Sequence, residues 1–270
     1  SGRVKAGEIV AIMGHSGCGK STLMNLLSGH YTKGMEGSIF LNDERLTPAL
    51  RRKIAYVTQV DIFHENLTVR EQLLYTAKLY LSGTHTNDEI LDIVTRVLNE
   101  LHILYISDVQ IKFLSGGQRK RCSIGSYLVS MPEFLLLDEP MSGLDSSAMS
   151  SLLGSLRVQA QSNVAILMTI HQPSTSVFYS FDWLLFLGGR GRVVYWGKPY
   201  EVMSYLAYYE FYPIYGPNSN PADFLMDLVC QEIYTYDGRT AFQFLVDTWD
   251  ETAPQPTDAN TPADLIEHPT

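Results

Sequence analysis

Short apolar runs alternate with longer segments of helical periodicity along most of the chain. The apolar runs have the length of buried strands, and they lie at residues 9–13, 53–58, 134–137, 164–169 and 182–187. Between them, apolar residues recur every three or four positions, which predicts helices at 22–28, 68–81, 87 to about 104, 115–129 and 146–160. Strands that alternate with helices predict an α/β fold with a mostly parallel sheet flanked by helices.

Two additions to this sheet are expected. The residues at 37–41 alternate into the turn Asn42-Asp43, and the runs 182–187 and 193–196 flank a glycine-rich turn, so both regions are typical of hairpins. They predict a small antiparallel β annex. The helices between about 60 and 130 predict a helical subdomain.

The expected folded domain covers residues 1–230. The remainder, 231–270, is interpreted as a linker or tail, because from Glu251 onwards it is rich in Pro, Thr, Asp and Ala. The chain opens almost directly on a turn and the first strand, so we expect the first strands of the domain to lie before Ser1.

Helix starts are marked by polar residues. Thr68 and Glu71 have the spacing of a capping box, and Asn87 is expected to cap the next helix. Asn220 followed by Pro221 predicts an N-cap with proline at the first helical position.

A glycine-rich segment follows the first strand and precedes the first helix. Residues 14–21 fit the pattern G-x-x-x-x-G-K-[ST] of a phosphate-binding loop. Glycines let successive backbone N–H groups converge on phosphate oxygens, and the helix N-terminus adds unpaired donors. Lys20 offers a positive charge to the β- and γ-phosphates, and the Ser21 hydroxyl is placed to ligate Mg²⁺. The expected nucleotide-binding residues here are Gly14, His15, Ser16, Gly17, Cys18, Gly19, Lys20, Ser21 and Thr22.

Polar residues follow three other predicted strands: Gln59, the pair Asp138 and Glu139, and His171. Ligands of such sheets bind at the carboxyl ends of the strands, so we expect these side chains to meet beside the phosphate loop. Asp138 is expected to orient Mg²⁺, and Glu139 to act as the general base that polarises a water for attack on the γ-phosphate.

Gln59 and His171 depend on this context for their interpretation. Alone, each would more often be a surface glutamine or a structural histidine. At strand ends, Gln59 can contact both the metal and the attacking water, and His171 can donate a hydrogen bond to the γ-phosphate. The expected catalytic residues are therefore Glu139, His171 and Gln59, and the expected metal ligands are Ser21, Gln59 and Asp138.

A second glycine-containing helix start lies in the middle of the chain. Ser115, Gly116, Gly117 and Gln118, here called the signature segment, resemble another phosphate cradle at a helix N-terminus. One triphosphate does not need two cradles in one chain. We therefore interpret this segment as part of a composite site that contacts the nucleotide held by another copy, and that closes around ATP.

Composition restricts the classes of partner. A net charge of −9 over 270 residues argues against a general nucleic-acid binder, whose phosphate contacts need a basic surface. Cys18, Cys122 and Cys230 lack metal-binding spacing and are expected to be reduced thiols. No apolar run approaches the length of a membrane span.

The order of these motifs resembles the ATPase domain of an ATP-binding-cassette (ABC) protein, a P-loop NTPase. The resemblance covers about residues 7–196 and rests on the phosphate loop, Gln59, Leu-Ser-Gly-Gly-Gln at 114–118, Asp138-Glu139, Ser-Gly-Leu-Asp at 142–145 and His171. The runs Gly-Gly-Gln-Arg-Lys-Arg, Thr-Ile-His-Gln-Pro-Ser and Asn-Pro-Ala-Asp-Phe are also similar to the G subfamily, the white-type and pleiotropic-drug-resistance exporters.

This resemblance implies an ATPase that uses ATP and Mg²⁺ to power the export of a lipid, sterol or xenobiotic. It implies a second ATPase domain as partner, with Ser115 and Gly117 on the partner's γ-phosphate and Asp145 across the interface. It further implies a membrane-spanning domain in the same polypeptide, and hence a membrane location with this domain on the cytosolic face. The transported substrate and the choice between a half- and a full-size transporter stay open.

Two alternatives remain beside the transporter. A soluble ABC-type ATPase of DNA maintenance or translation would typically carry a coiled-coil insertion, a zinc module or basic linkers, which this acidic chain lacks. A regulatory domain would bind ATP with little hydrolysis, against which Glu139 and His171 argue. The basic cluster Arg119-Lys120-Arg121 is either a solvated helix face, which we favour, or a contact to the membrane domain or anionic lipid.

Overall fold

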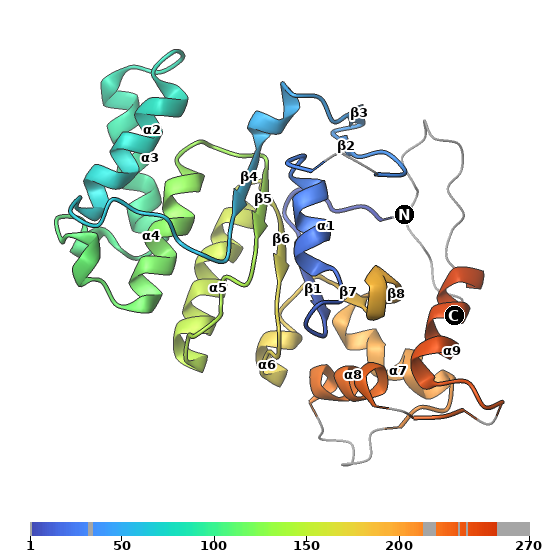
Figure 1. Ribbon diagram of the computed structural model, residues 1–270. Helices are drawn as coiled ribbons and strands as arrows, with labels where there is room; N and C mark the ends of the chain where they lie inside the picture. The colour runs from blue at the N-terminus through green and yellow to red at the C-terminus, as the bar shows by residue number, and fades with distance from the viewer. Residues whose placement is uncertain (1, 32–34, 213–219, 232, 236, 253–270) are drawn as a thin grey trace.

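A six-stranded sheet forms the centre of the molecule in the computed structural model, which describes residues 2–31, 35–212, 220–231, 233–235 and 237–252. The strand order is β4-β5-β6-β1-β7-β8, with parallel neighbours except for the antiparallel pair β7 and β8 (Figure 1). The strands are β1 (Ile9–Gly14), β4 (Ile54–Val57), β5 (Phe134–Leu137), β6 (Ala165–Thr169), β7 (Trp183–Leu187) and β8 (Val193–Gly197). The predicted mostly parallel α/β sheet is confirmed.

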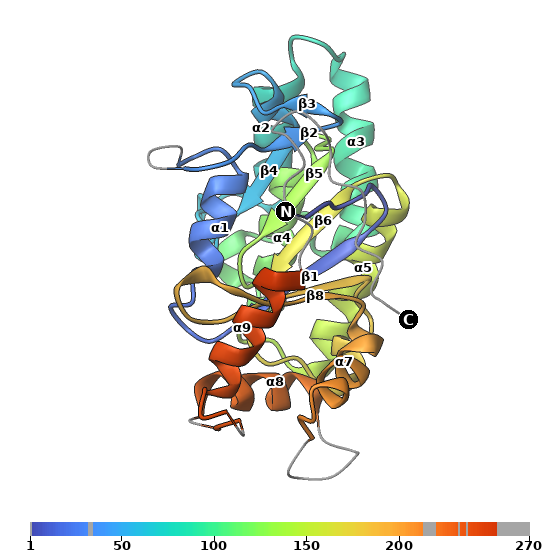
Figure 2. The same ribbon diagram turned by 90° about the vertical axis from the view of Figure 1, so that its right-hand side faces the viewer.

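Strand β1 is buried on both faces, and its side chains enter two different cores. Ile9 belongs to the larger core, together with buried residues of helix α5 (Ser146–Gln161). Ile12 belongs to the smaller core, together with Met24 of helix α1 (Lys20–Leu27). Figure 2 shows α1 and α5 on opposite sides of the sheet. Successive side chains of a strand point to opposite faces, so a strand covered on both sides has a continuous apolar sequence.

Three helices form the predicted helical subdomain, beyond the β4 edge of the sheet (Figure 1). They are α2 (Val69–Leu81), α3 (Asn87–Glu100) and α4 (Gly116–Leu128). The helices pack on one another, and α4 also contacts β4. The subdomain is thereby attached to the strand that leads to Gln59.

The helix starts agree with the sequence at two places and differ at one. Thr68 caps α2 in the predicted capping box, and the side chain of Asn220 accepts a hydrogen bond from the N–H of Ala222 at the start of α8 (Pro221–Cys230). The cap of α3, however, is Thr86 and not Asn87. Thr86 is the cap because Glu89 stands three residues later and completes a second capping box.

The antiparallel annex contains one of the two hairpins that the sequence predicts. In the part of the chain that the structure describes, only β2 (Phe40–Leu41) and β3 (Glu44–Arg45) form a separate two-stranded sheet, whereas the β7–β8 hairpin continues the main sheet. The other short elements are η1 (Leu50–Lys53), η2 (Leu104–Ile106), η3 (Ile111–Phe113), α6 (Thr175–Phe178), η4 (Gly189–Gly191), η5 (Pro199–Glu201) and α7 (Val202–Tyr208).

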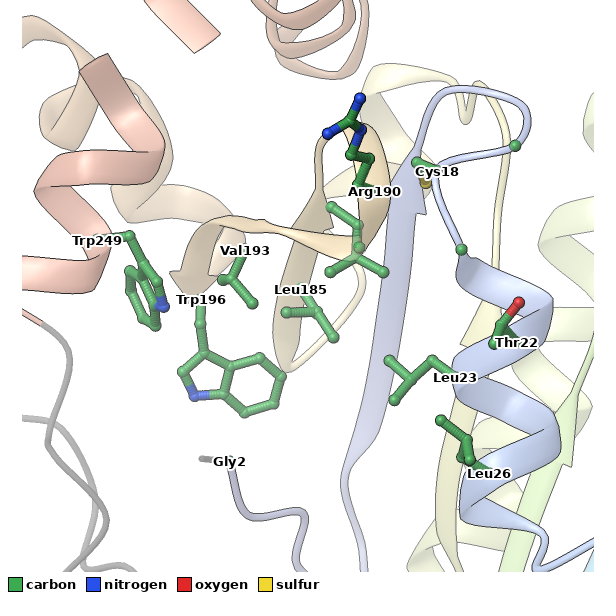
Figure 3. Close-up of a pocket in the computed structure, with 14 residues that line it drawn as sticks. Gly2, Cys18, Thr22, Leu23, Leu26, Leu185, Arg190, Val193, Trp196 and Trp249 are labelled. Atoms are coloured by element: carbon green, nitrogen blue, oxygen red, sulfur yellow. The ribbon is translucent and has the colours of Figure 1, made fainter. Parts of the chain in front are cut away.

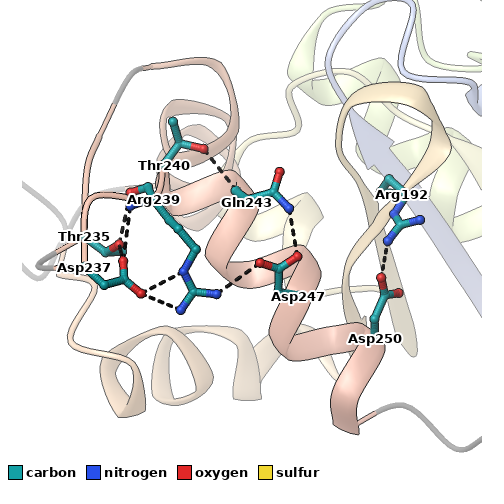
Figure 4. Close-up of polar contacts among 8 residues, drawn as sticks. All are labelled: Arg192, Thr235, Asp237, Arg239, Thr240, Gln243, Asp247 and Asp250. Carbon is teal, nitrogen blue, oxygen red and sulfur yellow. Dashed lines mark hydrogen bonds and ion pairs between the residues drawn. The ribbon is translucent and has the colours of Figure 1, made fainter.

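The part of the chain interpreted as a linker contains a packed helix, α9 (Ala241–Thr252). It buries Leu245, Val246 and Trp249 and contacts β8 and α8. Figure 4 shows the ion pairs of this helix: Asp250 pairs with Arg192 beside β8, and Asp247 pairs with Arg239, which also pairs with Asp237. The folded unit thus continues beyond residue 230, and residues 253–270 of the expected tail lie outside the described ranges.

Candidate nucleotide-binding site

The phosphate loop connects β1 to α1 and has the backbone that its glycines permit. Gly14 has φ +149°, and a Cβ added there would lie 2.2 Å from the carbonyl oxygen of Leu187, so only glycine fits. Gly19 stands at the N-cap of α1 with φ +112°, and no side chain caps this end. The first N–H groups of α1 therefore have no side-chain acceptor and are available to an anion.

Lys20 is buried beneath this loop. Its Nζ donates to the carbonyl oxygens of Gly14 at 2.8 Å and of His15 at 3.1 Å, and the residue is only 6% exposed. The ammonium group is thus held inside the curve of the loop. His15 Nδ1 donates to the Ser16 carbonyl at 2.6 Å, which keeps that ring close to the backbone.

The remaining residues of the loop differ in exposure. Ser16, Gly17, Ser21 and Thr22 are exposed, whereas Cys18 is fully buried in the smaller core. Ser21 and Thr22 lie in the first turn of α1, so both hydroxyls stand at the helix end that would face a bound phosphate.

Asp138 follows β5 and is held by two hydroxyl groups. Thr169 at the end of β6 donates to Asp138 Oδ1 at 2.7 Å, and Tyr56 of β4 donates to Oδ2 at 3.3 Å. Burial, reinforced by the nearby Asp138 carboxylate, raises the pKa of Tyr56 to about 12. Tyr56 therefore stays a neutral donor at physiological pH and fixes the orientation of the carboxylate.

Glu139 lies where three strand ends meet. Gln59 Nε2 donates to Glu139 Oε2 at 2.8 Å, and His171 Nε2 is 3.8 Å from Oε1. The Glu139 backbone has φ +48°, an uncommon conformation for a residue with a side chain, and its N–H donates to the Thr169 hydroxyl at 2.7 Å. The structure thus brings together the three predicted catalytic residues from β4, β5 and β6.

The predicted metal ligands have a suitable donor chemistry. Ser21, Gln59 and Asp138 offer a hydroxyl, an amide and a carboxylate oxygen, which are the hard oxygen donors that Mg²⁺ prefers. Asp138 is buried, and both of its bonds come from neutral hydroxyls. Within the described residues, no cationic side chain pairs with this carboxylate, so its negative charge is available to a metal ion.

The signature segment lies apart from the phosphate loop. Strands β4–β6 separate α4 from α1 (Figure 1). Ser115 caps α4 in a capping box: the Gln118 N–H donates to its hydroxyl at 3.4 Å, and the Ser115 N–H donates to Gln118 Oε1 at 2.9 Å. Gly116 and Gly117 form the first turn. The two phosphate cradles of one chain therefore lie apart. This separation is what the sequence analysis expects if the second cradle contacts the nucleotide of another copy.

Asp145 has a local role in this chain. Its carboxylate accepts hydrogen bonds from the N–H groups of Ser147 and Ala148 and caps α5. The Ser147 hydroxyl also donates to Asp145 Oδ1 at 2.7 Å, and this bond is the main reason that the pKa of Asp145 is lowered. The proposed position of Asp145 across an interface stays a prediction.

The basic cluster on α4 is not a freely solvated face, contrary to the favoured interpretation. Each of its cations bonds to another part of the chain: Arg119 to Glu65, Lys120 to Asp61 and the Gln59 carbonyl, and Arg121 to the Leu101 carbonyl, Ser151 and Ser155. Position along the sequence shows that three cations are adjacent, but not that each meets an acceptor on another element.

A cavity of about 530 Å³ adjoins the phosphate loop. Figure 3 shows it between α1 and the β7–β8 hairpin, with Trp196 and Trp249 on one side, Leu23 and Leu26 on the other, and Arg190 near the loop. Its walls are mainly apolar. The sequence analysis does not predict this cavity, because one of its walls comes from α9, within the stretch expected to be a linker.

Sequence reasoning also missed Thr169 and Tyr56. Thr169 bonds both acidic residues, and Tyr56 orients Asp138. The available signal was weak: Thr169 is a hydroxyl at the end of an apolar strand, and Tyr56 is an aromatic residue in another.

Comparison with known proteins identifies the family of this chain. The family model described as "ABC transporter" matches residues 1–142. The chain is 40% identical over 234 residues to ABC transporter G family member 22 of Arabidopsis thaliana and 41% identical over 247 residues to ABC transporter G family member 2 of Dictyostelium discoideum. These alignments cover 84% and 88% of this chain but only 31% and 19% of the relatives, so the chain spans less than a third of their length.

Solved structures support the fold. An ATP-binding cassette of an ABC transporter in its ADP conformation matches with a TM-score of 0.65 and 22% identity, over 77% of this chain and 88% of that one. A nucleotide-free cassette matches with a TM-score of 0.61 and 23% identity, over 72% and 82%. Among the helices of the described residues, none has the length and hydropathy needed to cross a bilayer.

Proposed function

The chain belongs to the ABC transporter family as a nucleotide-binding cassette, and from this premise we propose that it hydrolyses Mg²⁺-ATP with Glu139 as the general base. The observation that carries the proposal is the position of the Glu139 carboxylate, between Gln59 and His171 at the ends of three neighbouring strands. A carboxylate held there can accept a proton from a water that attacks the γ-phosphate.

The other residues have distinct roles in this proposal. Lys20 and the N–H groups around Gly19 bind the β- and γ-phosphates. Ser21, Gln59 and Asp138 would hold Mg²⁺, which neutralises phosphate charge when bound. His171 donates to the γ-phosphate, and the apolar cavity beside the loop offers a place for the nucleoside.

A second cassette completes the site in this proposal. The separation of the signature segment from the phosphate loop supports it, because the segment then has an exposed helix N-terminus to offer to a neighbouring nucleotide. Ser115 and Gly117 would contact that γ-phosphate, and Asp145 would lie at the interface. The partner is a cassette of the same or a paralogous chain.

The cassette would act on a membrane domain. The curated relatives are named transporters and extend far beyond the region that this chain covers. We propose that the cassette works at the cytosolic face of a membrane, attached to a membrane-spanning domain of the same polypeptide, and that ATP hydrolysis drives export. These names argue against a soluble ATPase unrelated to transport.

The test replaces Glu139 by glutamine and, as a control, makes the same substitution at an acidic residue at the other end of the same strand. Glu139→Gln should lower ATP turnover by on the order of 100-fold while ATP binding persists, because the amide cannot accept the proton. Glu133 immediately precedes β5, at the opposite end of this strand from Glu139, and pairs with Lys53. Glu133→Gln should retain turnover.

Phosphate release and ATP binding are measured on the purified chain at rising concentration, so that pairing is included. Undiminished turnover in Glu139→Gln would refute the assigned base. Tight ATP binding with no turnover in the unaltered chain would favour a regulatory cassette.

A further inference from the structure

A buried lysine joins the signature helix to the segment that carries Gln59. Lys120 is 7% exposed, and its Nζ donates to Asp61 Oδ1 at 3.0 Å and to the Gln59 carbonyl at 3.2 Å. The side chains of Lys120 and Asp61 are 9% and 16% exposed. The pair is therefore largely shielded from water, unlike the other ion pairs of this region.

The segment that this lysine holds has few other attachments. Residues 58–61, here called the β4 exit, leave the sheet after Val57, and Thr58, Gln59 and Val60 are all exposed. Within the exit, the Thr58 hydroxyl donates to the Val60 carbonyl at 3.0 Å, which shapes the turn but does not anchor it. Lys120 anchors the β4 exit at two points, the carbonyl of Gln59 and the carboxylate of Asp61.

Burial makes this anchor specific. A buried charge that loses its partner is costly, so the ammonium favours the one arrangement that supplies both the carboxylate and the carbonyl. The carbonyl belongs to Gln59 itself. The backbone that carries the Gln59 side chain is thus fixed while Nε2 donates to Glu139.

We infer that Lys120 is a positioning residue for ATP hydrolysis, which acts through Gln59 and links it to the signature helix. Lys120 lies in α4, whose first turn is the signature segment, so a displacement of α4 displaces the β4 exit with it. Contact of the signature segment with a neighbouring nucleotide would then be transmitted to Gln59, and so to the water and metal side of the site. This inference rests on the proposed function of Glu139.

The preceding residue provides a matched control. Arg119 is a cation on the same helix and pairs with Glu65 at 2.7 Å, but its side chain is 27% exposed and that of Glu65 is 50% exposed. Arg119 also donates to the Ile111 carbonyl and packs over Phe63, so its contacts hold neighbouring parts of the subdomain and do not involve Gln59.

The experiment compares Lys120→Met with Arg119→Met. Methionine keeps the length of the lysine stem but removes its charge. We expect Lys120→Met to lower kcat roughly tenfold to a hundredfold, because a misplaced Gln59 no longer orients the reacting groups, with ATP binding changed by less than about threefold. Arg119→Met should keep kcat within about threefold. Equal losses of kcat in the two variants would overturn the inference.

A double variant identifies the route. If Lys120 acts through Gln59, then adding Lys120→Met to Gln59→Ala should cause no further loss of kcat. A full multiplicative loss in the double variant would show that Lys120 acts elsewhere and would refute the inference. Should Lys120→Met fail to fold, as its circular dichroism would reveal, Asp61→Asn tests the same bond from the accessible side with the same expectations.

Hydrogen exchange provides a readout that does not depend on turnover. Amides of the β4 exit should exchange faster in Lys120→Met than in Arg119→Met or the unaltered chain. Unchanged exchange there would overturn the anchoring role even if ATP hydrolysis is confirmed. Faster exchange in a chain whose Glu139→Gln variant loses no turnover would instead show that the anchor exists and that the proposed base is wrong.

Discussion

Two helices of this molecule begin with the same ingredients, glycines at an N-terminus, and yet the two ends are in different states. Helix α1 starts at Gly19 with a left-handed backbone and no side-chain cap. Helix α4 starts at Ser115, whose capping box with Gln118 bonds the N–H groups of Ser115 and Gln118 within the chain. The end of α1 has no side-chain cap and is open to an anion, whereas part of the end of α4 is already bonded by side chains of its own first turn.

The difference suggests a division of tasks. An open helix end with Lys20 fixed beneath it can bind phosphate with little rearrangement. The capped N–H of Gln118 must exchange its internal hydrogen bond for one to a ligand, so the net gain at α4 is smaller and depends on another contribution, such as a second chain. The phosphate loop should therefore determine ATP binding by one chain, and the signature segment should determine what happens after pairing.

The largest effects should separate these two tasks. Lys20→Met should weaken ATP binding by the single chain roughly 100-fold, because it removes a charge-assisted bond. Gly117→Asp should leave that binding unchanged but lower turnover roughly 100-fold, because it places a negative charge where a neighbouring γ-phosphate would lie.

Gly117→Asp is expected to fold. A Cβ at Gly117 would meet only Leu144 Cδ2, at 3.6 Å, and an acid in the first turn favours a helix. Binding is measured by calorimetry at low protein concentration, and turnover by phosphate release. Weaker ATP binding by the single Gly117→Asp chain would contradict the division of tasks between the phosphate loop and the signature segment.

A smaller effect should distinguish the two roles of Ser115, as the cap of α4 and as a contact to a nucleotide. Ser115→Ala and Thr86→Ala each remove the side-chain oxygen of a capping box, on α4 and α3, and each should cost about 1 kcal/mol of unfolding free energy. Only Ser115→Ala should also reduce turnover, because only that hydroxyl is proposed to reach a nucleotide.

Urea unfolding and phosphate release on both variants provide the measurement. If turnover falls to the same extent in the Thr86 variant, Ser115 acts only as a cap and the proposed contact is refuted.

The smallest effect concerns Tyr56, which belongs to the phosphate-loop side. A tyrosine in an unfolded chain ionises near pH 10, whereas burial and Asp138 raise the pKa of Tyr56 in the folded chain to about 12. Between these values the unfolded state loses the proton first, so stability falls as the pH rises from about 10 to 12, and below pH 10 this contribution does not vary.

Tyr56→Phe should therefore show a shallower alkaline loss of stability than the unaltered chain, measured by urea unfolding at pH 9, 10 and 11. The other buried tyrosines contribute equally to both proteins, so the difference isolates Tyr56. Identical slopes would contradict the raised pKa of Tyr56 in the folded chain.

Local pattern was sufficient for much of this molecule. The apolar runs of β1 and β5 predicted buried strands because both faces of the sheet are covered, and the loop before α1 was recognisable because Gly14 and Gly19 need backbone angles that other residues avoid. The closed capping boxes at Thr68 and Ser115 also depend on neighbours within three residues. Such features follow from short-range sterics and hydrogen bonds, which the sequence states directly.

Only the tertiary structure decided which distant groups meet. The contact of Gln59 with Glu139, the hydroxyl that Thr169 lends to Asp138, and the burial of Lys120 against Asp61 join residues 30 to 80 positions apart. The packing of α9 on β8 likewise depends on side chains that look unremarkable in a polar C-terminal stretch. The sequence determined the elements and the chemistry available at their ends, but the burial of a charge or hydroxyl depends on which elements pack around it, and that is settled only by the folded chain as a whole.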